Sequence, residues 1–277
     1  MTIRKIIAAT DFSEPARAAL EEAAAIASAH QATLVIAHVA DPRRHPSATL
    51  EAERGVGRRL LDRACAELGE GFQCTSLLLE GFPDEQIVEM SRTEAADLVV
   101  VGSCGHGGVP RLSLGSVAQN VVRQSEIPVL VARGAGSAFG RILVATDFSD
   151  AADRALALAM ELVAPGGIVD VLHVVYVPAP IHGGPPALLD ASSLRRLEVE
   201  AARKGAELVI RHRRPGIDLR FAWELGKPRA GVLRRLESGH DLVALGSHGA
   251  RGLRRLLLGS VAGSMVQHAP CSVLVTN

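Results

Sequence analysis

The chain has few aromatic residues and no surplus of either charge. Aromatic side chains make up 3% of its 277 residues, and 30 basic residues balance 30 acidic ones. Single-stranded nucleic acids are bound on stacked aromatic rings, and nucleic-acid-binding proteins in general carry a basic face. The two shortages therefore exclude nucleic acid from the partners that we expect.

Long apolar runs and paired cysteines are also missing. No stretch approaches the roughly 18 uninterrupted apolar residues of a transmembrane helix, and the apolar N-terminal segment is too short for a signal peptide. Cys65, Cys74, Cys104 and Cys271 form no Cys-x-x-Cys pair and no spacing typical of a disulfide framework. We therefore predict a soluble, cytoplasmic protein with reduced thiols and no membrane partner.

What the chain does contain is one glycine pattern, present twice. Gly-Ser-Cys-Gly at 102–105 is followed by nine residues and Gly115-Ser116, and Gly-Ser-His-Gly at 246–249 is followed by nine residues and Gly259-Ser260. Each copy lies between an apolar run and a helical pattern. Glycines let backbone N–H groups approach a phosphate, and a helix N-terminus adds unpaired donors and partial positive charge. The repeated spacing predicts two anion sites.

A purely structural interpretation of these loops remains open. The loops would then only join strand to helix, with Ser116 and Ser260 as N-caps. A nine-residue excursion is longer than such a connection needs, which favours the phosphate site. Neither Gly-x-Gly-x-x-Gly nor Gly-x4-Gly-Lys-Ser/Thr occurs, so the usual dinucleotide and P-loop motifs are absent.

The duplication extends over the whole chain. Ile7–Ser13 returns as Leu143–Ser149, 136 residues later, whereas the glycines return after 144, so the second copy carries an insertion of about eight residues. The segment Pro178–Pro186 is the expected place for it. Small and polar residues at Arg133–Ala138 have the composition of a linker. The predicted domains are 1–136 and 137–277.

Each half alternates apolar runs with helical segments. Continuous Val/Ile/Leu runs between helices predict parallel strands buried on both faces. We expect an α/β fold of two tandem Rossmann-like domains, each a doubly wound, five-stranded parallel sheet. Ligands bind such sheets at the carboxyl ends of the strands, where strand order reverses. The expected strands are 4–9, 33–39, 73–79, 97–101 and 128–132, then 141–145, 168–174, 217–223, 241–245 and 272–276; the expected helices of the first half are 14–29, 48–69, 84–94 and 116–124.

The glycine pattern, the Ala-Thr-Asp-Phe-Ser segments at 9–13 and 145–149, and the terminal Val-Leu-Val strands resemble the universal stress protein family. The resemblance covers essentially the whole chain as two domains. It implies ATP in each half, with ADP or AMP as alternatives, together with Mg²⁺. It places Asp11 and Asp147 by the ribose and adenine, the backbone of Val39 and Val174 at the adenine, and the glycines at the phosphates. The expected ligand residues are Ala9, Thr10, Asp11, Val39, Val101, Gly102, Gly105, Gly115, Ser116 and Val117, then Ala145, Thr146, Asp147, Val174, Leu245, Gly246, Gly249, Gly259, Ser260 and Val261.

Asp11 and Asp147 also have a structural interpretation, as caps of the following helices. Ser13 and Ser149 lie closer to the expected helix starts and can fill that role. A carboxylate that accepts a hydrogen bond from a ribose hydroxyl suits the aspartates better.

His38 and His173 end equivalent strands, which suggests a metal or acid–base role. No second ligand residue lies at metal spacing in both halves, so we favour hydrogen-bonded structural histidines and name no metal or catalytic residue. Cys104 lies in the first glycine loop, where the second copy has His248. A thiol beside helix N–H groups is activated, yet one copy alone argues against shared redox chemistry.

The function that the resemblance implies is an ATP-binding stress-response module whose bound nucleotide alters its interactions. A slow ATPase or adenylating enzyme, and a scaffold without nucleotide, are the alternatives. Val129–Val131 and Val273–Val275 end their domains as apolar edge strands, which proteins rarely leave unpaired. Family members dimerise through these strands, so we expect an intramolecular pseudo-dimer, with a homodimer as a further option. The loops also predict tighter ATP binding in the second half, which has Arg251, Arg254 and Arg255 where the first has Arg111.

Overall fold

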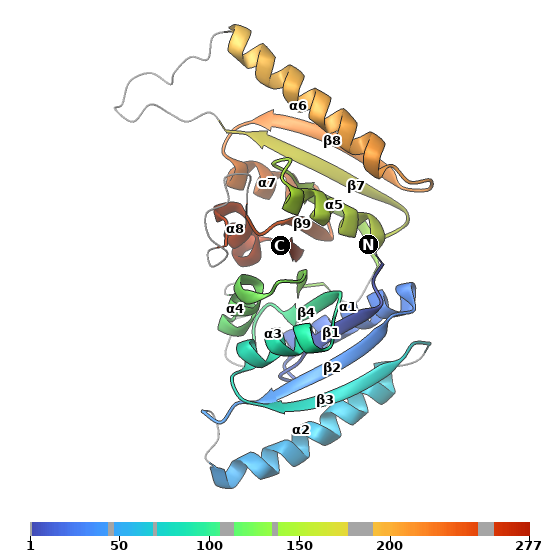
Figure 1. The fold of residues 1–277 in the computed structure, drawn as a ribbon, viewed down its shortest axis with the longest axis vertical. Helices are drawn as coiled ribbons and strands as arrows, with labels where there is room; N and C mark the ends of the chain where they lie inside the picture. The colour runs from blue at the N-terminus through green and yellow to red at the C-terminus, as the bar shows by residue number, and fades with distance from the viewer. Residues whose placement is uncertain are drawn as a thin grey trace, which may run out of the picture.

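The computed structural model describes residues 2–43, 47–68, 71–105, 114–134, 138–176, 191–248 and 258–277. Strands and helices alternate along both halves, as expected (Figure 1). The first half comprises β1 (Lys5–Ala9), α1 (Glu14–His30), β2 (Thr33–Ala40), α2 (Ser47–Leu68), β3 (Cys74–Glu80), α3 (Pro83–Thr93), β4 (Leu98–Gly102), α4 (Ser116–Gln124) and β5 (Val129–Ala132). The second comprises β6 (Phe139–Ala145), α5 (Asp150–Leu162), β7 (Val163–Val175), α6 (Ala191–His212), β8 (Asp218–Leu225), α7 (Pro228–Leu236), β9 (Leu242–Gly246), α8 (Ser260–His268) and β10 (Ser272–Thr276).

The strands form one ten-stranded sheet in the order β3-β2-β1-β4-β5-β10-β9-β6-β7-β8. Within each half the pairs are parallel and the strand order is the same, which confirms the predicted doubly wound topology. The order reverses between β1 and β4, and again between β6 and β9. Ligand crevices of doubly wound sheets lie at such reversals.

The halves are joined by their last strands. β5 and β10 pair antiparallel, with Leu130 opposite Leu274 and both side chains fully buried. This is the expected pairing of the two apolar edge strands inside one chain. It removes the exposed edge that each five-stranded sheet would otherwise present.

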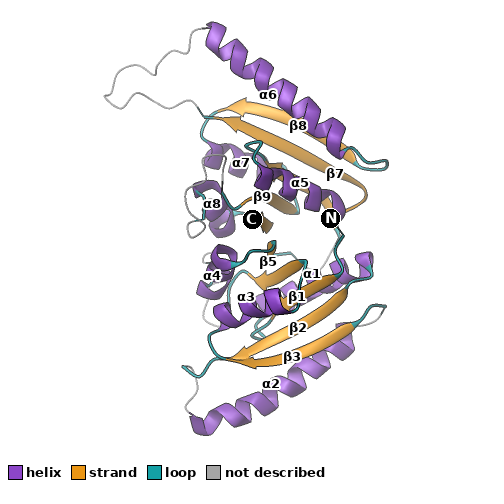
Figure 2. Ribbon diagram, in the orientation of Figure 1, coloured by secondary structure: helices purple, strands orange, loops and turns teal. Residues whose placement is uncertain are grey.

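Helices cover both faces of the sheet (Figure 2). The core on one face is built from α1, α2, α5 and α6, and that on the other from α3, α4, α7 and α8. Alternate residues of each strand supply the two cores: Ile6 and Ala8 point to one face, Ile7 to the other. In the described part of the chain, no helix is long and apolar enough to cross a membrane.

Some predicted boundaries were wrong. β7 begins at Val163 rather than at 168, and β6 begins at Phe139 rather than at 141, because Phe139 pairs with Val163 before a shift in register. The expected insertion at 178–186 and residues 135–137 of the linker lie outside the described residues.

The prediction of reduced cysteines was wrong for one pair. Cys65 in α2 and Cys74 at the start of β3 form a disulfide, with Cα atoms 5.7 Å apart. The two residues meet because α2 packs along β3, a tertiary contact that cysteine spacing does not reveal. Cys104 and Cys271 are free and buried, as expected for reduced thiols.

Candidate functional site

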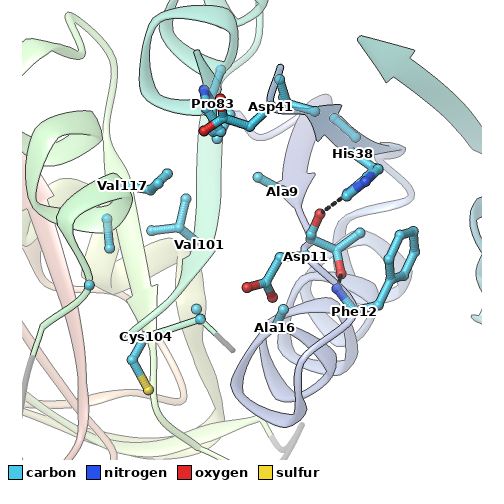
Figure 3. A pocket seen from close by; sticks show the side chains of 18 of the residues that line it. Ala9, Asp11, Phe12, Ala16, His38, Asp41, Pro83, Val101, Cys104 and Val117 are labelled. Carbon is cyan, nitrogen blue, oxygen red and sulfur yellow. Dashed lines mark hydrogen bonds between the residues drawn. The ribbon is translucent and has the colours of Figure 1, made fainter. Parts of the chain in front are cut away.

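A cavity of about 700 Å³ opens at the strand-order reversal of the first half, where β1 lies beside β4 (Figure 3). The side chain of Asp11 points from the β1 side toward Val101 and Cys104 in this view. All ten residues expected to bind ligand in this half line the cavity: Ala9, Thr10, Asp11, Val39, Val101, Gly102, Gly105, Gly115, Ser116 and Val117.

The turn between β1 and α1 fixes the Asp11 carboxylate. Its Oδ1 accepts hydrogen bonds from the Ser13 amide (3.1 Å) and the Ser13 hydroxyl (2.5 Å). Phe12 has a φ of 63°, a left-handed conformation stabilised by donation from its amide to Thr10 Oγ1 (2.9 Å). Ser13 is the N-cap and accepts from the Ala16 amide (3.4 Å). Ser13 therefore caps α1, as predicted, and Asp11 acts through the turn.

The two ends of the first glycine loop are hydrogen-bonded to each other where α4 begins. The Gly115 amide donates to the Ser103 carbonyl (2.8 Å), and Gly115 occupies the N-cap position without any side-chain cap. First-turn amides of α4 therefore receive no side-chain oxygen and face the cavity beside Ser116 and Val117. This open N-terminus is the type of site that binds phosphate.

Two other glycines allow close approaches that a side chain would prevent. A Cβ on Gly102 would lie 2.9 Å from the Pro15 carbonyl oxygen, so β4 passes directly against the start of α1. A Cβ on Gly105 would lie 2.3 Å from Asp11 Oδ2. The glycine loop and the β1 turn thus form one continuous wall, which explains the glycines physically.

His38 is a structural residue, as the sequence interpretation favoured. Its Nδ1 donates to the Thr10 carbonyl (2.8 Å), and its ring lies 4.6 Å from that of Phe12. Among the described residues, no group of three or more His, Cys, Asp or Glu side chains is arranged to hold a metal ion.

Sequence reasoning missed one charged residue of the cavity. Asp41 follows β2, its side chain is 7% exposed, and it pairs with Arg43 (2.8 Å), whose guanidinium lies 4.3 Å from the centre of the Phe82 ring. Arg43 donates hydrogen bonds to the Asp41 carboxylate, and they raise the pKa of its guanidinium. Asp41 lies two residues after Val39, at a strand end that faces the crevice. This position was the clue to Asp41 that the sequence offered.

Helix α2 supplies a second missed part of the wall, through Val56, Gly57 and Leu60. Pro83 and Ile87 of α3 complete the cavity. In a sequence, an apolar helix residue that lines a cavity has the same pattern as one that packs in the hydrophobic core. The sequence therefore could not identify these residues as part of the cavity wall.

The second half repeats the turn almost bond for bond. Asp147 Oδ1 accepts from the Ser149 amide (3.1 Å) and hydroxyl (2.6 Å), and Phe148 has a φ of 64°. His173 Nδ1 bonds to the Thr146 carbonyl (2.8 Å). The two turns therefore present their carboxylates in the same way.

The other expected residues of the second half lie at the matching strand and helix ends. Gly259 donates to the Ser247 carbonyl (2.7 Å) and is the N-cap of α8, again without a side-chain cap. Gly249 lies outside the described residues, as do Arg111, Arg251, Arg254 and Arg255. Ala145 ends β6 and Thr146 follows it, Val174 lies near the end of β7, Leu245 and Gly246 end β9, and Ser260 and Val261 begin α8.

A duplicated Rossmann-like sheet with a glycine loop at each order reversal defines the class of protein, and comparison with known proteins gives the family. The model of the universal stress protein family matches residues 2–133 and 138–277. The chain therefore belongs to the universal stress protein family, with two copies of the family's domain.

Similar proteins and structures agree with this assignment. A universal stress protein of Mycolicibacterium smegmatis is 25% identical over 98% of this chain and 96% of its own length. One from Thermus aquaticus is 37% identical over 47% of this chain and 98% of its own length, the size of one half. The crystal structure of a universal stress protein from Archaeoglobus fulgidus superposes with a TM-score of 0.73 at 24% identity, covering 99% of this chain and 98% of that one, and so shares the fold.

Proposed function

We propose that each half binds an adenine nucleotide at its crevice and that the bound nucleotide regulates the protein's interactions in a stress response. The observation that carries the proposal is the cavity of the first half. It brings together a fixed carboxylate from β1 and the open N-terminus of α4.

The chemistry of the cavity matches the parts of ATP. The Asp11 carboxylate is an acceptor for ribose hydroxyls, and the backbone of Val39 at the end of β2 is available to the adenine edge. The amides that open α4 after Gly115 suit the phosphates. Mg²⁺ would then be held mainly by phosphate oxygens and water, as is usual for Mg²⁺ with nucleotides.

The second site rests on the repeated turn and helix start. Asp147 and the α8 N-terminus after Gly259 have the same bonds as their counterparts, so we propose the same ligand there. The division into domains at residues 136 and 137 remains a prediction of the same kind. A homodimer and a cytoplasmic location also remain predictions.

The first test is mass spectrometry of small molecules released when the purified protein is denatured, followed by calorimetry with ATP. We expect adenine nucleotide to be released, or ATP to bind to the emptied protein. A protein that releases no nucleotide and shows no thermal shift with ATP would instead be a scaffold. Phosphate release faster than about one per second per chain would instead indicate an ATPase.

Two glycine variants locate the binding. A Cβ on Gly115 would lie 3.2 Å from Cys104 Cα, and one on Gly259 would lie 3.0 Å from the Ser247 carbonyl oxygen. Gly115→Val and Gly259→Val should therefore each abolish one site. Gly263→Ala is the control, because its Cβ would touch only Leu258, at 3.8 Å, and both sites should survive.

A further inference from the structure

The cavity of the first half continues beyond the residues that suit ATP, along helix α2. Val56 and Leu60 line it although they are 46% and 38% exposed. Their apolar side chains thus face the cavity and the solvent rather than the core. Phe12 and His38 line the same region, next to Asp11 (Figure 3). We call Phe12, His38, Val56, Gly57 and Leu60 the side chamber.

A close approach of α2 shapes the side chamber. A Cβ on Gly57 would lie 3.1 Å from His38 Cδ2, so the helix backbone lies almost against the imidazole. His38 donates from Nδ1 to the Thr10 carbonyl, which fixes the orientation of its ring. The chamber therefore combines the apolar walls of Phe12, Val56 and Leu60 with the edge of the His38 ring.

The second half does not repeat this wall. At the places along α6 that Val56 and Leu60 occupy along α2, it has Glu200 and Lys204, which form an ion pair (3.3 Å). The Lys204 ammonium lies 5.5 Å from the centre of the Phe148 ring, the counterpart of Phe12. The turns are the same, yet the two helix positions beside them are apolar in one half and charged in the other.

We propose that the side chamber binds a small apolar acyl or aryl group attached to the ribose of an adenine nucleotide in the first site. This inference rests on the proposed nucleotide binding. The chamber is continuous with the cavity and adjoins Asp11, the residue assigned to the ribose, so a ribose substituent is the part of the ligand that reaches it. Exposed apolar walls favour an apolar group because both are removed from water on contact.

The test compares ATP with 2′/3′-O-(N-methylanthraniloyl)-ATP, whose aromatic group sits on the ribose and fluoresces more strongly in apolar surroundings. Both are titrated into Gly259→Val, in which only the first site is intact. We expect the substituted nucleotide to bind about tenfold more tightly than ATP, with a blue shift of its emission. Equal or weaker binding would overturn the side chamber while leaving the proposed ATP site intact.

Charged substitutions in the α2 wall of the side chamber test whether the ribose substituent binds there. Leu60→Lys and Val56→Glu, in the Gly259→Val background, introduce the residue types of α6 and should each remove most of the tenfold preference and the blue shift. Val199→Glu changes an apolar residue of α6 that is 61% exposed and should alter neither. A preference that survives both α2 variants would overturn the assignment. If neither nucleotide binds to the parent protein, the proposed function itself fails.

Discussion

The two halves share a ligand-facing turn but differ in what surrounds it. The hydrogen bonds of Asp11 and Asp147 agree within 0.1 Å, as do those of His38 and His173. Around the first turn lie the Asp41–Arg43 pair and the apolar side chains of Val56 and Leu60, whereas Tyr176 and the Glu200–Lys204 pair stand at the matching places of the second.

The rims of the two sites also differ in charge. The first turn of α3 carries Asp84 and Glu85, and the first turn of α7 carries no acid and begins after Lys227. Local turn geometry is retained because any change in it would move the carboxylate. The covering helices line the crevice from outside the turn, and their residues differ between the halves.

The largest expected effect concerns the β5–β10 pair, to which the two halves contribute equivalent strands. Leu130→Pro and Leu274→Pro each remove a ladder donor from a strand that has neighbours on both sides, so each should cost more than about 3 kcal/mol of unfolding free energy. Urea unfolding and the radius of gyration from X-ray scattering provide the measurement. Leu130→Val keeps the amide and is the control. Full stability and compactness in either proline variant would show that β5 and β10 do not join the halves.

A second prediction concerns a buried carboxyl group of the first half that contacts the second half. Glu22 of α1 is 1% exposed, accepts a hydrogen bond from Ser272 of β10 (3.0 Å), and its Oε1 has no partner. The Gly134 amide also bonds to it, and neighbouring Arg133 binds the carbonyls of Val266 and Ala269 instead. Glu22 therefore links the two halves from a desolvated position.

Burial raises the pKa of Glu22 from 4.5 to about 7. The folded state therefore binds a proton on the Glu22 carboxyl more tightly than the unfolded state does. The stability that this proton contributes is complete below pH 4.5 and is lost as the pH rises through 7. The loss should reach about 3 kcal/mol. We expect Glu22→Gln, which stays neutral, to lose less stability than the parent protein between pH 5 and pH 8 in urea unfolding. Parallel pH profiles would contradict this.

The third prediction uses the Cys65–Cys74 disulfide, which the first half alone contains; Leu219 occupies the place of Cys74 in β8. A loop of this length should contribute about 2.6 kcal/mol by restricting the unfolded chain. Cys74→Ser, or a reducing agent, should lower the thermal midpoint of the parent protein. The reducing agent should not affect Cys74→Ser further, because Cys104 and Cys271 are free. An unchanged midpoint in both cases would refute the stabilisation.

The smallest expected effect is the difference in ATP affinity between the sites. One productive arginine contact from Arg251, Arg254 or Arg255 would favour the second site by about tenfold. Calorimetry should therefore give tighter ATP binding in Gly115→Val than in Gly259→Val. Equal ATP affinities in the two variants would contradict the prediction. Tighter binding in Gly259→Val would show that the first site is the stronger one.

Much of the first site was predictable because its parts are local. The Thr-Asp-Phe-Ser turn bonds to itself within four residues, and the glycine spacing reports a loop that closes at the start of α4. The missed residues Asp41, Val56 and Leu60 reach the cavity only after α2 and α3 pack over the sheet. The sequence around Val56 and Leu60 contains no trace of that packing, whereas Asp41 could have been found from its place at the end of β2.

By itself, the sequence determined the duplicated α/β fold, the strands and the glycine loops, because hydrophobic period and glycine placement act over short stretches of chain. The tertiary structure decided the rest. It brought Cys65 to Cys74 and buried Glu22 against Ser272 of the other half. It also placed the apolar side chains of Val56 and Leu60 beside one crevice and the Glu200–Lys204 ion pair at the matching place of the other half. Each of these depends on which distant segments meet, and side-chain packing between segments settles that question.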